Sequence, residues 1–183
     1  MIARTTRSAS FAVVSETERP ERRHHEPAGE RATLEAFLDD YRDIVVRKVS
    51  GLSDEDARRP LVPSGTSVGG LLKHLRWAEY GWFEQFLQGR LDDNRRTHDR
   101  AREFEMQPDE SLPILVAEYQ AQCEESRSIA AQYPLDHELR HGRLETTVSL
   151  GWIYLHMIQE TARHTGQIDI LREQLDGATG FDG

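Results

Sequence analysis

Apolar residues recur with the period of an α-helix in four segments of this chain, and no segment shows the alternation of a strand. The four segments span residues 33–49, 68–88, 112–133 and 147–175. In each of them apolar side chains return at every third or fourth position, which predicts an amphipathic helix. Four such helices without strands predict an all-α fold, specifically a four-helix bundle.

The connections between these segments differ in length. Residues 91–107 are dense in Arg and Asp and have little apolar periodicity, so they predict a long crossover loop, which can cover a site. Residues 134–146 form a shorter polar connection. A long crossover means that the helices need not follow a simple up-down-up-down order.

The chain has 183 residues, which fits one domain with a tail. Residues 1–29 have no apolar period of either kind, and we expect them to form a disordered N-terminal tail. The bundle domain is then predicted over residues 30–183.

Charge and cysteine content exclude several classes of function. The formal net charge of −9 has the wrong sign for neutralising nucleic-acid phosphates or an anionic membrane. The one cysteine, Cys123, excludes an internal disulfide, a zinc ribbon and a CxxC redox pair. It lies on the apolar stripe of its helix, which favours a buried thiol over a nucleophile.

With no export signal and no bilayer-spanning apolar run, we expect a cytoplasmic protein.

Polar side chains interrupt the apolar face of the last helix. At about 100° per residue, His164 lies near +40° and His156 near −40° from Glu160, on the face that also carries Ile153 and Leu171. A buried carboxylate costs several kcal/mol unless it is paired or coordinates a metal. Glu160 and His164, one turn apart, can reach the same cation.

The second helix supplies a third candidate ligand. His74 lies at the flank of its stripe, where it can turn toward the last helix. Two imidazoles and one carboxylate would leave coordination positions open for solvent or substrate. We therefore predict that His74, Glu160 and His164 hold a divalent metal, with His156 as the spare ligand.

Several alternatives remain open at this point. His74 could be a boundary histidine bonded to a carbonyl, and the polar residues could satisfy one another without a metal. Glu79, which falls inside its stripe, could accept a hydrogen bond from a ligand histidine or form a buried ion pair with an arginine. Glu138 and His141 form an ExxH, but a ferritin-type di-iron centre needs a second such motif on a helix of the bundle.

Two strings carry a resemblance to a known family. SVGGLLKHLRWAEYGWF at 67–83 and LHMIQETARHTGQIDILREQLDG at 155–177 closely resemble the DinB superfamily of YfiT-like metalloenzymes. The resemblance covers about residues 30–180 and is nearest to an actinobacterial branch related to the mycothiol-dependent maleylpyruvate isomerases. Many members have histidine where this chain has Glu160, whereas those isomerases have a similar His, Glu, His set.

The resemblance implies His74, Glu160 and His164 as ligands of a divalent metal, often zinc or nickel. It also implies long crossovers, a homodimer, and transfer or isomerisation of a small-molecule substrate with a low-molecular-weight thiol such as mycothiol. Three readings follow: a metal-dependent thiol S-transferase, a metal-dependent hydrolase that activates water, and a bundle without enzymatic activity. The sequence names no catalytic residue beyond the predicted ligands.

Overall fold

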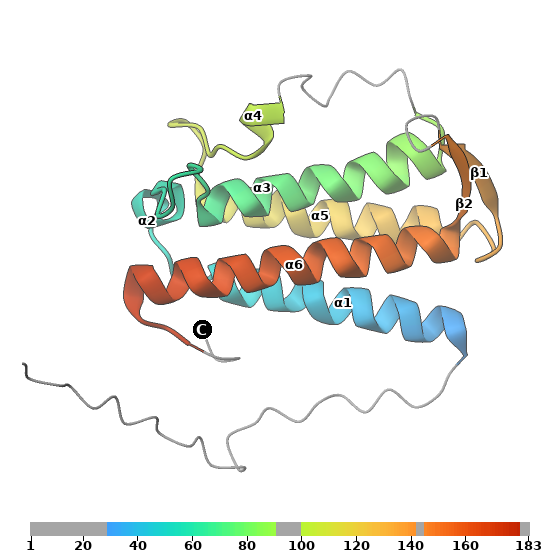
Figure 1. Ribbon diagram of the computed structural model, residues 1–183, viewed down its shortest axis with the longest axis horizontal. Helices are drawn as coiled ribbons and strands as arrows, with labels where there is room; N and C mark the ends of the chain where they lie inside the picture. The colour runs from blue at the N-terminus through green and yellow to red at the C-terminus, as the bar shows by residue number, and fades with distance from the viewer. Residues whose placement is uncertain (1–28, 91–99, 142–144, 180–183) are drawn as a thin grey trace, which may run out of the picture.

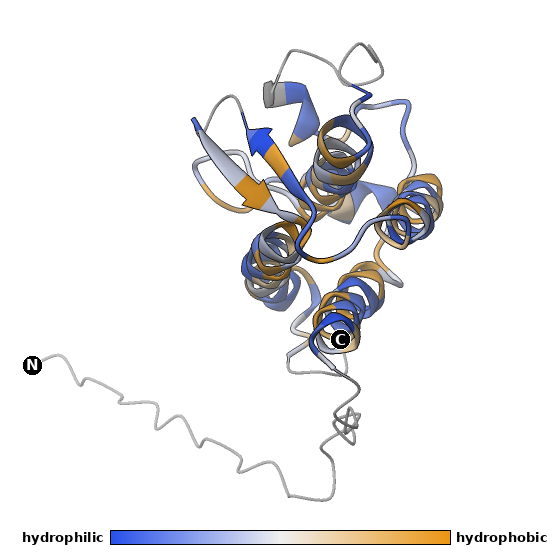
Figure 2. Cartoon of the chain, turned by 90° about the vertical axis from the view of Figure 1, so that its right-hand side faces the viewer, coloured by the Kyte–Doolittle hydropathy of each residue, from blue (hydrophilic) through white to orange (hydrophobic). Residues whose placement is uncertain are grey.

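The computed structural model describes residues 29–90, 100–141 and 145–179, and most of these residues are helical (Figure 1). Four long helical segments lie side by side, and Figure 2 shows them end-on. They are α1 (Glu30–Val49), α3 (Val68–Glu79) continued by the π-helix η2 (Tyr80–Leu87), α5 (Leu112–Ala130) and α6 (Leu150–Asp176). Two short helices, α2 (Asp54–Arg58) and α4 (Arg100–Glu103), lie in the connections. The predicted all-α character is confirmed at this level.

Local signals explain where the long helices begin and end. The side-chain oxygens of Ser67 and Ser149 accept hydrogen bonds from backbone amides in the first turns of α3 and α6. Gly177 ends α6 in the left-handed conformation, with φ of 78°. The predicted helix ends are therefore right to within a few residues, although α1 begins at Glu30 rather than at residue 33.

The helices run in two parallel pairs. In Figure 1, α1 and α6 run in one direction, whereas α3 and α5 both run in the other. The end of η2 and the start of α5 therefore lie at opposite ends of the molecule, and the segment between them crosses its length. The described part of this crossover contains α4, a helix that the sequence pattern does not predict.

The second helix changes its geometry after Glu79. A continuous α-helix predicts that Trp82, Phe83 and Phe86 face the core, but in the π-helical turn the buried residues are Tyr80, Phe83, Glu84 and Leu87. A π-turn contains more residues than an α-turn, so it shifts which side chains face inward. Trp82 and Phe86 are consequently only partly buried.

A small antiparallel sheet corrects the prediction that strands are absent. Strands β1 (Glu138–His141) and β2 (Thr146–Ser149) pair between α5 and α6, with His141 opposite Thr146. The fourth predicted helix thus begins at Leu150 rather than at residue 147. Each strand has four residues, too few to show a clear period of two in the sequence.

The core lies between the four long segments. Fully buried apolar side chains come from all of them and include Leu38, Val45, Leu72, Leu75, Phe83, Tyr119, Ile153, Met157 and Ile168. Among the described residues, no helix has the length and hydrophobicity that would fit a lipid bilayer. The predicted tail, residues 1–29, lies outside the described residues except for Gly29, so that prediction and the domain boundary remain predictions.

Candidate metal centre

The structure brings the three predicted ligands together between α3 and α6. Nε2 of His74 lies 3.0 Å from Oε1 of Glu160, and Nε2 of His164 lies 3.3 Å from the same oxygen. One potential ligand atom from each residue falls within 4.8 Å of the others. The two imidazole rings meet edge to face, with their centroids 4.8 Å apart. Two ring nitrogens thus converge on one carboxylate oxygen.

Helical phase explains most of this arrangement. His74 is 6% exposed and His164 is 8% exposed, since α6 packs on the flank of α3. Glu160, however, is not fully buried as expected, because 25% of its side chain is exposed. The centre of the buried stripe of α6 lies about 60° to 100° away, through Met157 and Thr161, so Glu160 occupies its edge. An ion or small molecule could therefore approach this carboxylate from solvent.

A hydrogen bond orients the His164 ring. Its Nδ1 lies 2.6 Å from Oε1 of Gln167, and an amide oxygen only accepts, so Nδ1 carries a proton. The other ring nitrogen, Nε2, faces Oε1 of the Glu160 carboxylate at 3.3 Å. A proton or a metal cation between these two atoms makes the contact favourable. The donor set therefore fits a cation.

The Glu160 carboxylate is ionised in this setting. Hydrogen bonds with His164 and His74 hold the pKa of this carboxyl well below its usual range, although partial burial acts in the opposite direction. His74 differs from His164 because its buried Nδ1 has no hydrogen-bond partner in the described part of the chain. Instead, its ring stacks on Phe104, with centroids 4.0 Å apart and planes 17° from parallel.

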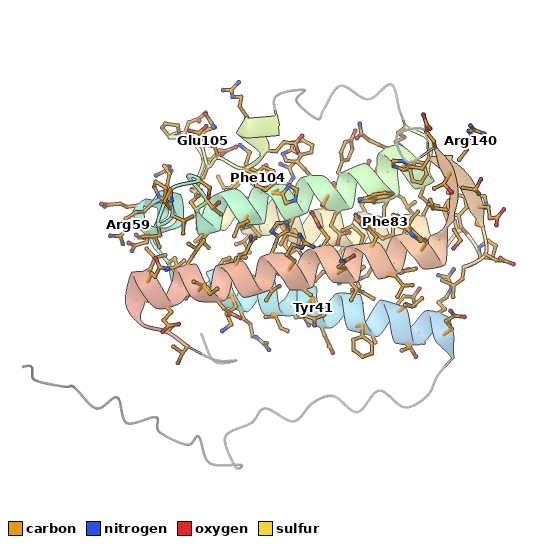
Figure 3. The ribbon with its side chains drawn as sticks, viewed as in Figure 1. Tyr41, Arg59, Phe83, Phe104, Glu105 and Arg140 are labelled. Atoms are coloured by element: carbon orange, nitrogen blue, oxygen red, sulfur yellow. The ribbon has the colours of Figure 1, made fainter. Side chains whose placement is uncertain are left out.

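Phe104 is a site residue that the helix pattern missed. It lies at the described end of the crossover, immediately after α4, and Figure 3 labels it on the α4 side of α3. The expectation that the crossover can cover a site is met here by one aromatic ring. The available signal was a lone aromatic residue in a charged segment, RAREFEM.

Glu79 forms a buried ion pair with an arginine, which is the second of the two roles that the sequence left open. Its Oε1 and Oε2 accept hydrogen bonds from Nε and Nη2 of Arg42 at 2.8 and 2.6 Å. Glu79 is 1% exposed and Arg42 is 4% exposed, so the pair is closed to solvent. Both carboxylate oxygens of Glu79 are thus bonded to the guanidinium of Arg42.

A comparison with protein families matches residues 33–177 to the mycothiol S-transferases. The match covers most of the chain and includes every residue of the centre. The chain belongs to the mycothiol S-transferase family. The resemblance to DinB-like proteins is confirmed, since this family is part of that mycothiol-associated superfamily. A search of curated proteins finds no match.

Within this member of the family, Cys123 is buried as predicted. The thiol is 2% exposed, and burial raises its pKa well above the ordinary value of 9.0, with a further contribution from the nearby Glu79 charge. A neutral, enclosed thiol is a poor nucleophile.

The remaining candidates lie outside the three-residue group. His156, the spare ligand, stacks on Trp152 with centroids 5.2 Å apart and lies 4.6 Å from the Trp82 ring. Burial lowers its pKa. His141 of the ExxH ends β1, and its ring stacks on Trp82 and meets Phe86 edge to face. These histidines pack in an aromatic cluster one or more turns from Glu160.

Proposed function

We propose that this protein is a metal-dependent mycothiol S-transferase whose divalent metal is held by His74, Glu160 and His164. The observation that carries the proposal is the convergence of the two Nε2 atoms on one carboxylate oxygen, in a chain whose family is mycothiol-associated. Imidazole nitrogen and carboxylate oxygen suit zinc and nickel, the two metals that we favour. Three protein ligands leave at least one coordination position for a substrate atom.

A divalent cation at this centre would supply Lewis acidity that lowers the pKa of a thiol, so that the thiolate predominates near neutral pH. The chain contributes the geometry: Glu160 offers the negative charge, and Gln167 holds the His164 ring with Nε2 facing inward. In the transfer, the thiol proton leaves to solvent and the sulfur forms a bond to an electrophilic carbon. In a substitution, a leaving group departs from that carbon with the electrons of its bond. In an addition, the attacked carbon belongs to a double bond, and the atom at the other end of that bond takes up a proton.

The buried Cys123 supports an external nucleophile. Its thiol is enclosed and stays protonated, so this side chain does not compete with mycothiol for the electrophile. The alternative hydrolase needs a general base for water, and Glu79, a carboxylate of the same helix as His74, is the residue to consider for that role. Both Glu79 oxygens are bonded to Arg42, which leaves the transferase as the better-supported function.

The proposal extends to the fold. Two parallel helix pairs joined by a long crossover are what a DinB-type four-helix bundle requires, and we assign this chain to that type. In such a bundle, facing side chains of neighbouring helices build the metal site, as His74 on α3 and the pair on α6 do here.

An S-transfer assay tests the function. Mycothiol and a chromogenic electrophile are incubated with the metal-stripped protein, the protein after addition of zinc or nickel, and His164→Ala. We expect turnover only in the presence of both metal and thiol, and its loss in His164→Ala. His137→Ala is the matched control, because this histidine packs on Tyr133 outside the centre. Turnover without any thiol would contradict the transferase and favour the hydrolase.

A further inference from the structure

The segment that carries Phe104 is seated on the first turns of α3. Met106, two residues after Phe104, is 2% exposed and packs in the same core cluster as Val68 and Leu71. In Figure 3 the segment with Phe104 and Glu105 lies along one side of α3, and α6 lies along another. One side of His74 is therefore covered by this segment, whereas α6 supplies the other ligands.

Two glycines of α3 make this close approach feasible. A Cβ at Gly70 would lie 2.0 Å from the backbone oxygen of Phe104, and one at Gly69 would lie 2.6 Å from the sulfur of Met106. The first contact is with backbone, which cannot move aside as a flexible side chain can. Glycine is a poorer helix former than alanine, so the adjacent pair marks a position where another backbone approaches α3 closely.

Polar bonds fix the same segment on both sides of Met106. Nζ of Lys73 donates to the Glu105 carbonyl at 3.2 Å and to the Glu110 carboxylate at 2.9 Å. That carboxylate also accepts from the Gln107 amide at 2.7 Å, and Arg58 donates to the Glu110 carbonyl at 2.8 Å. Lys73 precedes His74 in the chain, so these bonds place the segment next to the ligand histidine.

The two histidines of the centre differ in what orients their rings. A metal-binding histidine usually donates its second N–H to an acceptor that fixes the ring. His164 has such an acceptor in Gln167, but Nδ1 of His74 has none among the described residues. The nearly parallel Phe104 ring restricts rotation of the His74 plane, since a turned imidazole would collide with it.

We infer that Phe104 is a positioning residue of the metal centre, seated by Gly69 and Gly70, that holds His74 in the plane required for ligation. The inference rests on the proposed metal site and adds a role for the crossover segment. Phe104 acts through His74 and takes no part in the chemistry. Outer residues that orient a ligand typically change metal affinity by about 10-fold to 100-fold when they are replaced.

Cobalt binding tests this role without an activity assay. The metal-stripped full chain is titrated with Co²⁺, and its visible absorption gives both affinity and coordination geometry. We expect Phe104→Ala to bind about tenfold more weakly with an altered spectrum. Phe104→Tyr, which keeps the flat ring, should restore both values. Phe37→Ala is the matched control, because this phenylalanine of α1 is 49% exposed.

Two further variants keep the test decisive if Phe104→Ala unfolds. Phe104→Leu keeps an apolar side chain of similar size but lacks the flat ring, and we expect weaker Co²⁺ binding. Gly70→Ala displaces the segment without changing Phe104 and should have the same effect. Wild-type affinity and spectrum in folded Phe104→Leu would overturn the inference while the metal site stands. Failure of the wild type to bind Co²⁺ would overturn the metal site and the inference together.

Discussion

Glu79 on α3 and Glu160 on α6 are carboxylates of two neighbouring helices, and their partners give them opposite roles. Glu79 faces a guanidinium, is 1% exposed, and has both oxygens bonded. Glu160 faces two imidazoles through one oxygen, and 25% of its side chain is exposed. The Arg42 guanidinium neutralises Glu79, and we call this buried pair the closed cluster. His74, Glu160 and His164 form the open cluster, which retains negative charge and access to solvent. The identity of the partner therefore separates a structural ion pair from the proposed metal-ligand set.

The largest expected effect comes from breaking the closed cluster. Arg42→Ala leaves the Glu79 carboxylate buried without a partner, which should lower the free energy of unfolding by about 3–5 kcal/mol. Urea unfolding followed by circular dichroism measures this loss. Glu160→Ala in the metal-free protein should cost only about 1 kcal/mol, since it removes hydrogen bonds at a half-open site.

The matched control replaces both members of the ion pair. Arg42→Met combined with Glu79→Leu removes the charges together, and its stability should lie much closer to wild type than that of Arg42→Ala. If Arg42→Ala and Glu160→Ala were equally destabilising, the distinction between a closed and an open cluster would be wrong.

Metal addition should stabilise the open cluster alone. Zinc at about 100 times its dissociation constant should raise the free energy of unfolding of the wild type by about 2.7 kcal/mol, since the ion binds only the folded state. The Arg42→Met, Glu79→Leu protein should show the same gain, and Glu160→Ala should show none. Thermal melts with and without zinc give the values. A full gain in Glu160→Ala would mean that the ion binds elsewhere.

A smaller effect is expected at Cys123, beside the closed cluster. Cys123→Ala should cost about 1 kcal/mol through a small cavity and leave thiol transfer unchanged. The raised pKa of Cys123 means that the folded state keeps the thiol proton. Its contribution to stability is therefore present below the ordinary pKa of 9.0 and is lost as pH rises above it.

Alkylation with iodoacetamide, followed by mass spectrometry, provides the measurement. Native Cys123 should react slowly and with little change between pH 7 and pH 9, whereas the urea-unfolded chain should react faster as the pH rises. Rapid alkylation of the native protein together with loss of transfer activity would make Cys123 the nucleophile instead.

The smallest effect is expected from removal of residues 1–28. They lie outside both the described residues and the family match at 33–177, and their sequence has no apolar face to bury. We expect a change of less than about 0.5 kcal/mol in the free energy of unfolding, with metal binding unaffected. A large drop in melting temperature would show that these residues pack on the helices.

The sequence predicts those parts of the fold that depend on helical period. Glu160 and His164 meet because residues four apart share a helix face, and His74 joins them from the flank of a second stripe. The exposure of Glu160 was missed because the stripe was centred on Glu160 itself rather than on Met157 and Thr161. A small error in the assumed direction of the buried face is therefore enough to predict a boundary side chain as buried.

Features that depend on a change of helix type or on contacts distant in sequence do not follow from the helical period. The π-turn at Tyr80–Leu87 breaks the assumed period, so Tyr80 and Leu87 face the core where Trp82 and Phe86 were expected. The Arg42–Glu79 pair joins two helices whose rotation about their axes the sequence does not give. The adjacent glycines at 69 and 70 are a local sign that another backbone packs on α3. That backbone belongs to the segment that brings Phe104 to His74.

The metal content of the protein tests the central claim most directly. Wild-type protein and His164→Ala are both purified without an affinity tag under the same conditions. Their metal content is then measured by inductively coupled plasma mass spectrometry. The account predicts one divalent metal ion per wild-type chain and a large loss in His164→Ala, since two of the three ligands bind far more weakly than the complete set. A metal-free wild type, or a His164→Ala protein with full occupancy, would contradict it.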